Sequence, residues 1–80
     1  MDIRRQVGMN VARIRREQGL SQEELAFRSG LHRTYISGVE RGIRNPTITV
    51  IQEIASALVV DVAILVASTK QNSKYSGIRY

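Results

Sequence analysis

The 80-residue chain contains no cysteine and no tryptophan, and only one histidine and one proline. Without cysteine it can form neither a disulfide framework nor a thiolate zinc site, and a single histidine cannot build a histidine cluster around a metal. We therefore expect no metal and no cofactor. A chain of this length has room for one hydrophobic core, so its stability must come from efficient helix packing, from a partner subunit, or from both.

Long apolar runs are also absent. Arg4 and Arg5 near the N-terminus are not followed by the apolar stretch of a signal peptide. The most apolar run, residues 57–67, is too short to cross a bilayer and is interrupted by Asp61. We expect a cytoplasmic protein without a membrane partner.

Positive charge predominates in the first half of the chain. Basic residues outnumber acidic residues by 12 to 7, which gives a formal net charge of +5. Residues 1–45 hold nine arginines and no lysine against five acidic residues, whereas residues 46–67 hold no basic residue. Guanidinium groups bind phosphates and guanine edges through two parallel hydrogen bonds. The preference for arginine therefore favours nucleic acid as the partner over a merely solvated helical face.

The spacing of apolar and capping residues predicts five short helices. Val7, Val11 and Ile14, for example, recur at the three- and four-residue intervals of one helix face. Ser21 and Glu24 have the spacing of a capping box, in which each side chain binds the other residue's backbone amide. The expected helices cover about residues 2–18, 22–29, 33–41, 48–58 and 62–67.

Turn and cap residues separate these helices. Gly30 lies in a three-residue turn between the second and third helices, and two short helices joined through a glycine turn form a helix-turn-helix. After a proline-containing loop, Thr47 can cap the fourth helix, and Asp61 can cap the fifth. The expected fold is therefore a compact all-α, five-helix domain over residues 1–67, followed by a polar, flexible tail over residues 68–80.

Several motifs, in this order and spacing, resemble the Cro/phage-repressor (XRE-type) family of helix-turn-helix proteins. They are Ser-Gln-Glu-Glu-Leu-Ala at residues 21–26, Ser-Gly-Leu at 29–31, Tyr-Ile-Ser at 35–37, Glu-Arg-Gly at 40–42 and Arg-Asn-Pro-Thr at 44–47. The resemblance covers about residues 7–67, and residues 33–38 together with the short chain are most similar to the controller proteins of restriction–modification systems. It implies a lambda-repressor-like fold and a transcriptional regulator that binds double-stranded DNA sequence-specifically.

The second helix of this motif enters the major groove of DNA, and the resemblance gives that role to the helix that starts near residue 33. Arg33, Thr34 and Ser37 on its outer face are then expected to read base edges. Arg33 is the best candidate, because its fork can bind guanine O6 and N7 together; the alternative for it is a phosphate contact. For Gly38 two alternatives stay open, a close approach of the helix backbone to the DNA or a tolerated defect that lowers the stability of the helix relative to alanine.

Residues around this helix are expected to bind the DNA backbone. Gln22 begins a helix whose amides attract anions, and Arg44 and Asn45 open the loop after the recognition helix. For Tyr35 two alternatives stay open, a place at the edge of the core or a hydroxyl contact with a phosphate. The full set is Gln22, Tyr35, Arg41, Arg44 and Asn45.

Four other positions are interpreted through the same resemblance. Arg15 and Glu40 match family positions that form an ion pair between the first and third helices, so both are assigned to the fold rather than to DNA. His32 stands at the cap of the recognition helix, where imidazole is a poor substitute for Ser, Thr or Asp. Val59 stands where the family usually has a glycine, so the fourth helix is expected to end differently or to run on.

The segment after the arginine-rich half is unusually apolar. Fifteen of the 22 side chains in residues 46–67 are apolar, and a helix near its end would be apolar all round, which is typical of an interface. We predict a two-fold homodimer whose seam contains Val59, Val60, Ile64 and Leu65. It would place two recognition helices about 34 Å apart on a pseudo-palindromic operator. The alternative is a monomer in which the last helix is fully buried.

Two other classes of function fit the sequence less well. One histidine and seven acidic residues form no spacing typical of acid–base or metal catalysis, so we do not expect an enzyme. An antitoxin-like or anti-repressor module would use the same fold to bind another protein, but it would need apolar or acidic groups where Arg33, Arg41 and Arg44 stand. No segment has the length of a ligand-sensing domain, so no small-molecule ligand is expected.

Overall fold

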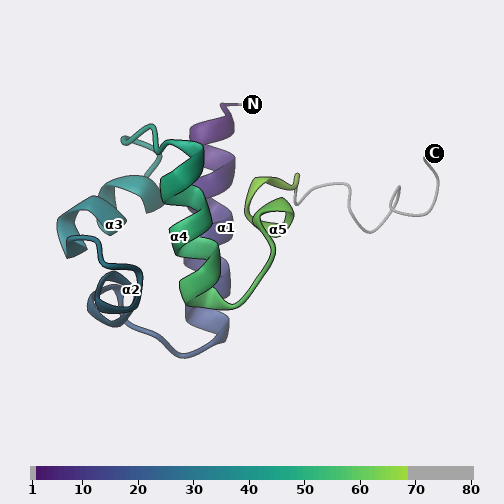
Figure 1. Ribbon diagram of the computed structural model, residues 1–80. Helices are drawn as coiled ribbons and strands as arrows, with labels where there is room; N and C mark the ends of the chain where they lie inside the picture. Colours follow the sequence, from purple (N-terminus) through teal and green to yellow (C-terminus); the bar gives the residue numbers. More distant parts are fainter. Residues whose placement is uncertain (1, 69–80) are drawn as a thin grey trace.

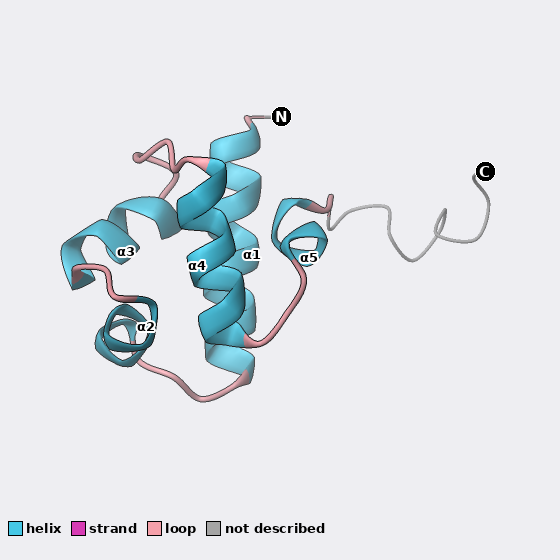
Figure 2. Ribbon diagram, in the orientation of Figure 1, coloured by secondary structure: helices cyan, strands magenta, loops and turns pink. Residues whose placement is uncertain are grey.

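Five helices follow one another along residues 2–68, the part of the chain that the computed structural model describes. They are α1 (Ile3–Glu17), α2 (Gln22–Ser29), α3 (Arg33–Glu40), α4 (Ile48–Leu58) and α5 (Val62–Val66), and this range contains no strand (Figure 2). The all-α prediction is confirmed, with every helix end within one residue of its expected position. None of these helices is long and apolar enough to span a membrane. The predicted tail lies, from residue 69 onward, outside the described residues.

The two longest helices form the centre of the molecule. α1 and α4 lie side by side, with α2 and α3 on one side of them and α5 on the other (Figure 1). α3 packs against α1 and α2, whereas α5 packs against α1 and α4. All five helices contribute fully buried aliphatic side chains to the core, namely Val11, Leu25, Ile36, Ile54, Leu58 and Leu65. The helix-turn-helix is thus held on one side of the core, away from α5.

Local capping explains where α2 and α4 begin. The Ser21 hydroxyl accepts from the Glu24 N–H at 3.0 Å and the Ser21 N–H donates to the Glu24 carboxylate at 2.8 Å, which is the predicted capping box. The bond from the Ser21 backbone lowers the pKa of Glu24. The stabilisation that this hydrogen bond contributes is therefore complete at pH values above the ordinary pKa of a glutamate. It is lost as the pH falls through the lowered pKa of Glu24. Thr47 caps α4 by accepting from the Val50 N–H at 3.2 Å.

Two other cap positions lack a side-chain bond. His32 precedes α3 without capping it, as expected for an imidazole. The expectation that Asp61 caps α5 is wrong, because its carboxylate makes no cap hydrogen bond. Asp61 is exposed, so hydration competes with such a bond. The first turn of α5 is closed instead by the Ile64 N–H, which donates to the Asp61 backbone carbonyl at 3.0 Å.

Gly8 permits close contact between α1 and α3. A Cβ atom at this position would overlap the Val39 carbonyl oxygen and would lie 2.8 Å from the Glu40 carbonyl oxygen. Since these are backbone atoms, a larger residue would push the two helices apart. α1 runs through Gly8 without a break, and the last turn of α3 rests against it.

Val59 ends α4 in a strained conformation. The helix does not run on: it stops at Leu58, and Val59 itself has a φ of 59° and a ψ of 47°. This left-handed conformation is unfavourable for a residue with a β-branched side chain. Because the Val59 side chain is 84% exposed, burial within the monomer does not compensate for the strain.

Replacing Val59 with glycine is expected to stabilise the folded chain. Glycine adopts the left-handed conformation without strain, so the free energy of unfolding should rise by about 1 kcal/mol and the Tm by about 4–8 °C. Val59→Ala keeps the Cβ atom and should give a smaller rise. Thermal unfolding followed by circular dichroism in dilute protein measures both changes, and a lower Tm for Val59→Gly would show that the valine is not strained.

Candidate nucleic-acid interface

A buried ion pair joins α1 to the end of α3. The Arg15 guanidinium donates from Nε to Glu40 Oε2 at 2.7 Å and from Nη2 to Glu40 Oε1 at 3.1 Å. A third bond runs from Nη1 to the Leu20 carbonyl oxygen at 2.8 Å. The Arg15 and Glu40 side chains are only 10% and 5% exposed, and the hydrogen bonds to Glu40 raise the pKa of Arg15 above its ordinary value. The structure thus brings together the two residues to which the resemblance gave a structural role.

Gln22 connects this pair to α2. Its Nε2 donates to Glu40 Oε1 at 3.0 Å, and the residue is half-buried. Glu40, the last residue of α3, therefore accepts hydrogen bonds from both α1 and α2, which fixes the three helices relative to one another. The amide nitrogen carries a second N–H, and this is the group that would donate to a phosphate in the expected contact of Gln22.

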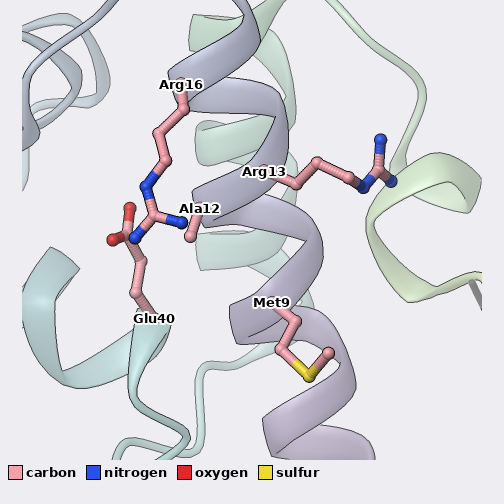
Figure 3. A pocket seen from close by; sticks show the side chains of 5 residues that line it. All are labelled: Met9, Ala12, Arg13, Arg16 and Glu40. Atoms are coloured by element: carbon pink, nitrogen blue, oxygen red, sulfur yellow. The ribbon is translucent and has the colours of Figure 1, made fainter.

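An open hollow of about 340 Å³ lies beside the ion pair, between α1 and the end of α3 (Figure 3). Its lining residues are Met9, Ala12, Arg13, Arg16 and Glu40. Figure 3 shows the Arg16 side chain extending toward Glu40, while that of Arg13 extends to the other side of α1. Within residues 2–68 no three histidine or acidic side chains gather as a metal site would require. The hollow thus combines one carboxylate, that of Glu40, with arginine side chains.

The outer face of α3 carries the residues that are expected to read bases. Arg33 and Thr34 are exposed at its N-terminal end, and Ser37, one turn later, is half-buried. Ile36 and Val39 on the opposite face are buried in the core. The N-terminal half of α3 is thus uncovered on one side, as a helix that enters a major groove requires.

Gly38 does not present its backbone to the outside, contrary to the first of its two alternatives. It is buried, because the side chain of Arg44 lies on it: a Cβ atom at Gly38 would be 2.7 Å from Arg44 Cγ. The loop after α3 folds back onto the helix, and the Ile43 and Arg44 N–H groups both donate to the Gly38 carbonyl oxygen, at 2.9 and 3.2 Å. The Arg44 guanidinium carbon lies 5.5 Å from the centre of the Tyr35 ring, a cation–π contact.

The loop between α3 and α4 (Figure 2) carries further exposed basic side chains. Arg41, Arg44 and Asn45 are all exposed there, as expected for residues that bind a DNA backbone. Glu40, the acidic residue of α3, is neutralised by Arg15, so it does not oppose their charge. Tyr35 is half-buried and packs against the core, which is the first of its two alternatives; a contact between its hydroxyl and a phosphate stays a prediction.

Asn10 fixes the position of α5, a role that the sequence analysis missed. It is fully buried, and its Nδ2 donates to the carbonyl oxygens of Leu65 and Ala67, both at 2.8 Å. Gln6 Nε2 donates to the Val66 carbonyl oxygen at 2.6 Å. These bonds satisfy carbonyl groups that the end of a helix leaves without a partner. One signal was present in the sequence, because a polar residue at position 10 interrupts the apolar face of α1.

The predicted dimer seam is exposed only in part. Val59 and Ile64 are 84% and 45% exposed, Val60 is half-buried, and all three line a shallow groove where α4 meets α5. The expectation for Leu65 is wrong: it is completely buried in the core, because α5 is docked on α1 through the hydrogen bonds of Asn10. Since α5 and α3 lie on opposite sides of α1 and α4, a partner in this groove would leave α3 uncovered (Figure 1).

Comparison with known proteins agrees with the arrangement of α2 and α3. A helix-turn-helix family model (HTH_3) matches residues 11–65. The chain belongs to the helix-turn-helix family. The family resemblance on which the residue roles above depend is therefore confirmed.

Relatives in this family align with most of the chain. It is 51% identical over 71 residues to the uncharacterized HTH-type transcriptional regulator y4dJ of Sinorhizobium fredii, covering 89% of this chain and 92% of the relative. It is 46% identical over 74 residues to the control protein C.SmaI of Serratia marcescens, covering 92% and 86%. A solved structure of the restriction–modification controller protein C.Esp1396I, a tetramer in complex with its natural 35-base-pair operator, has a TM-score of 0.75 at 40% identity, covering 81% of this chain and 86% of that one.

Removing Arg15 is expected to destabilise the fold strongly. Arg15→Ala leaves the buried Glu40 carboxylate without its partner, so the free energy of unfolding should fall by about 3–5 kcal/mol. Arg13→Ala is the matched control, because Arg13 on the same helix forms an ion pair with Glu17 whose side chains are 46% and 62% exposed. Arg13→Ala should lower the free energy of unfolding by less than about 1 kcal/mol. Urea unfolding measures both, and equal losses would contradict a structural role for Arg15.

Proposed function

We propose that the chain is a transcriptional regulator that binds a pseudo-palindromic operator in double-stranded DNA as a homodimer, with α3 in the major groove. The observation that carries the proposal is the uncovered N-terminal half of α3, where Arg33 and Thr34 are exposed, followed by a loop with further exposed arginines. A helix of this width fits the major groove, and guanidinium groups match both guanine edges and phosphates.

Each side chain of this surface has a proposed role. Arg33, Thr34 and Ser37 read base edges, with Arg33 binding a guanine through two hydrogen bonds. The phosphate contacts come from the N-terminus of α2 and from the end of α3 with its loop, through Gln22, Tyr35, Arg41, Arg44 and Asn45. These phosphate contacts fix the register of the protein on DNA without reading its sequence.

The groove between α4 and α5 is the proposed seam of the homodimer. Val59 and Ile64 supply its exposed apolar surface, together with the half-buried Val60. Leu65 is buried and has no part in this seam. A two-fold axis at this groove would present two copies of α3 to half-sites one helical turn apart. The C.Esp1396I complex, in which four subunits share one operator, supports an assembly of several copies on DNA.

The relatives suggest where such a regulator acts. C.SmaI is a control protein and C.Esp1396I is a restriction–modification controller protein, and we extend the role of controller to the present chain. The proposal includes no catalytic step, and it places the protein in the cytoplasm, where bacterial DNA lies. The antitoxin-like or anti-repressor alternative is disfavoured, because exposed arginines rather than apolar or acidic side chains occupy the outer face of α3 and its loop.

Selection of bound DNA from a random pool, followed by Arg33→Ala on the selected operator, tests the function. We expect a two-fold symmetric sequence to be enriched. Arg33→Ala should weaken binding to it by about 5- to 100-fold and should weaken binding to random DNA much less, because one guanine contact is lost. Arg13→Ala removes the same charge from a side chain that extends away from α3 and is the control (Figure 3).

Two results would count against this assignment. If Arg33→Ala weakens selected and random DNA equally, Arg33 contacts a phosphate rather than a base. If no sequence is enriched at all, the chain is not a sequence-specific regulator.

A charge in the groove is expected to separate the subunits. Ile64→Glu would place a carboxylate against the apolar surface of the partner. Desolvation of this carboxylate is unfavourable, so the chain should sediment as a monomer at micromolar concentration. Phe27→Glu makes the same change on an exposed apolar side chain of α2, a helix that does not line the groove, and should leave the dimer intact. A parent chain that is itself monomeric at this concentration would rule out a stable dimer.

A further inference from the structure

Gly38 lies inside α3 although nothing in the backbone requires a glycine there. Its conformation is helical, and the glycines with positive φ within residues 2–68 are Gly19, Gly30 and Gly42. A glycine in the interior of a helix lowers its stability relative to alanine. The absence of a side chain at position 38 therefore needs another explanation.

Contact with Arg44 supplies that explanation. A Cβ atom at Gly38 would lie 2.7 Å from Arg44 Cγ, 3.3 Å from Nε and 3.5 Å from Cδ, so the stem of the arginine occupies the space that a side chain would fill. The Arg44 backbone is held at the same place, because its N–H donates to the Gly38 carbonyl oxygen at 3.2 Å. Both the backbone and the stem of Arg44 are thus located by Gly38.

Tyr35 locates the other end of the same side chain. It precedes Gly38 by three residues, so both lie on one side of α3. The Arg44 guanidinium carbon is 5.5 Å from the centre of the Tyr35 ring. The stem therefore lies over Gly38 and the charged group over the aromatic ring, along the surface of the proposed recognition helix.

We propose that Gly38 is a positioning residue for DNA binding, which keeps the guanidinium of Arg44 in place before DNA arrives. This inference depends on the proposed function, in which Arg44 binds a phosphate. An arginine that moves freely in solution loses rotamer freedom when it binds, and a side chain that is already held in place avoids part of this loss. Gly38 thus lowers the stability of its helix and raises the affinity for DNA.

Gly38→Ala should change stability and affinity in opposite directions. The alanine favours the helix, but its Cβ atom would lie 2.7 Å from Arg44 Cγ, which clears it only if the arginine turns about its Cα–Cβ bond. The Tm should therefore rise, but by less than the increase of about 4–8 °C that the helix gain alone would give. Affinity for the selected operator should fall by about 2- to 13-fold, because the displaced Arg44 must be ordered on binding. A mutation that merely disturbed the fold would lower both quantities.

Arg44→Ala and the double variant Gly38→Ala/Arg44→Ala complete the experiment. Arg44→Ala should weaken operator binding and reduce the slope of log K against log salt concentration by about 0.9, the value for one phosphate contact. The double variant should bind no more weakly than Arg44→Ala alone, because Gly38 acts through Arg44. Fluorescence anisotropy on the selected operator over a series of salt concentrations measures all three variants and the parent.

Each failure has its own meaning. If Arg44→Ala leaves affinity and salt slope unchanged, the proposed phosphate contact of Arg44 is wrong, and the inference fails with it. If Arg44→Ala weakens binding and Gly38→Ala does not, the phosphate contact stands and the positioning role is overturned. If the losses add in the double variant, Gly38 touches DNA itself and the inference is also overturned. A lower Tm for Gly38→Ala would show that Arg44 cannot move aside, and would overturn it as well.

Discussion

The bidentate ion pair between Arg15 and Glu40 is the contact on which the geometry of this domain depends. Glu40 ends α3, receives two hydrogen bonds from α1 and a third from Gln22 at the start of α2, and is almost entirely buried. A buried charge is tolerated only when it is paired, so the three helices are held to one relative arrangement. That arrangement determines which side of α3 faces the core and which side can meet DNA.

Two glycines allow further close contacts around α3. Gly8 lets the last turn of α3 approach α1 more closely than any other residue would permit, and Gly38 makes room on α3 for the side chain of Arg44. On the far side of the molecule, the buried amide of Asn10 holds α5 and leaves Val59 and Ile64 exposed. The proposed DNA surface and the proposed dimer seam are therefore separate, and each depends on a residue of α1.

Most of the helix boundaries could be predicted because they depend on neighbouring residues. The Ser21–Glu24 capping box and the cap at Thr47 need only a few positions of sequence to be recognised. Contacts between distant residues carry no such local signal. The pairing of Arg15 with Glu40, 25 residues apart, followed only from the family resemblance. From the sequence, the burial of Leu65 is only the alternative to an interface, because it depends on a contact of its helix with Asn10, 55 residues earlier.

The position of α3 on DNA can be measured directly. The chain lacks cysteine, so a single cysteine in place of exposed, non-capping His32 can carry a DNA-cleaving iron chelate at the start of α3 without side reactions. With the selected operator, we expect two clusters of cuts that lie in the major groove about 10 base pairs apart, one from each copy of α3. Cuts spread evenly along the DNA, or clustered in the minor groove, would contradict the placement of α3 in the major groove.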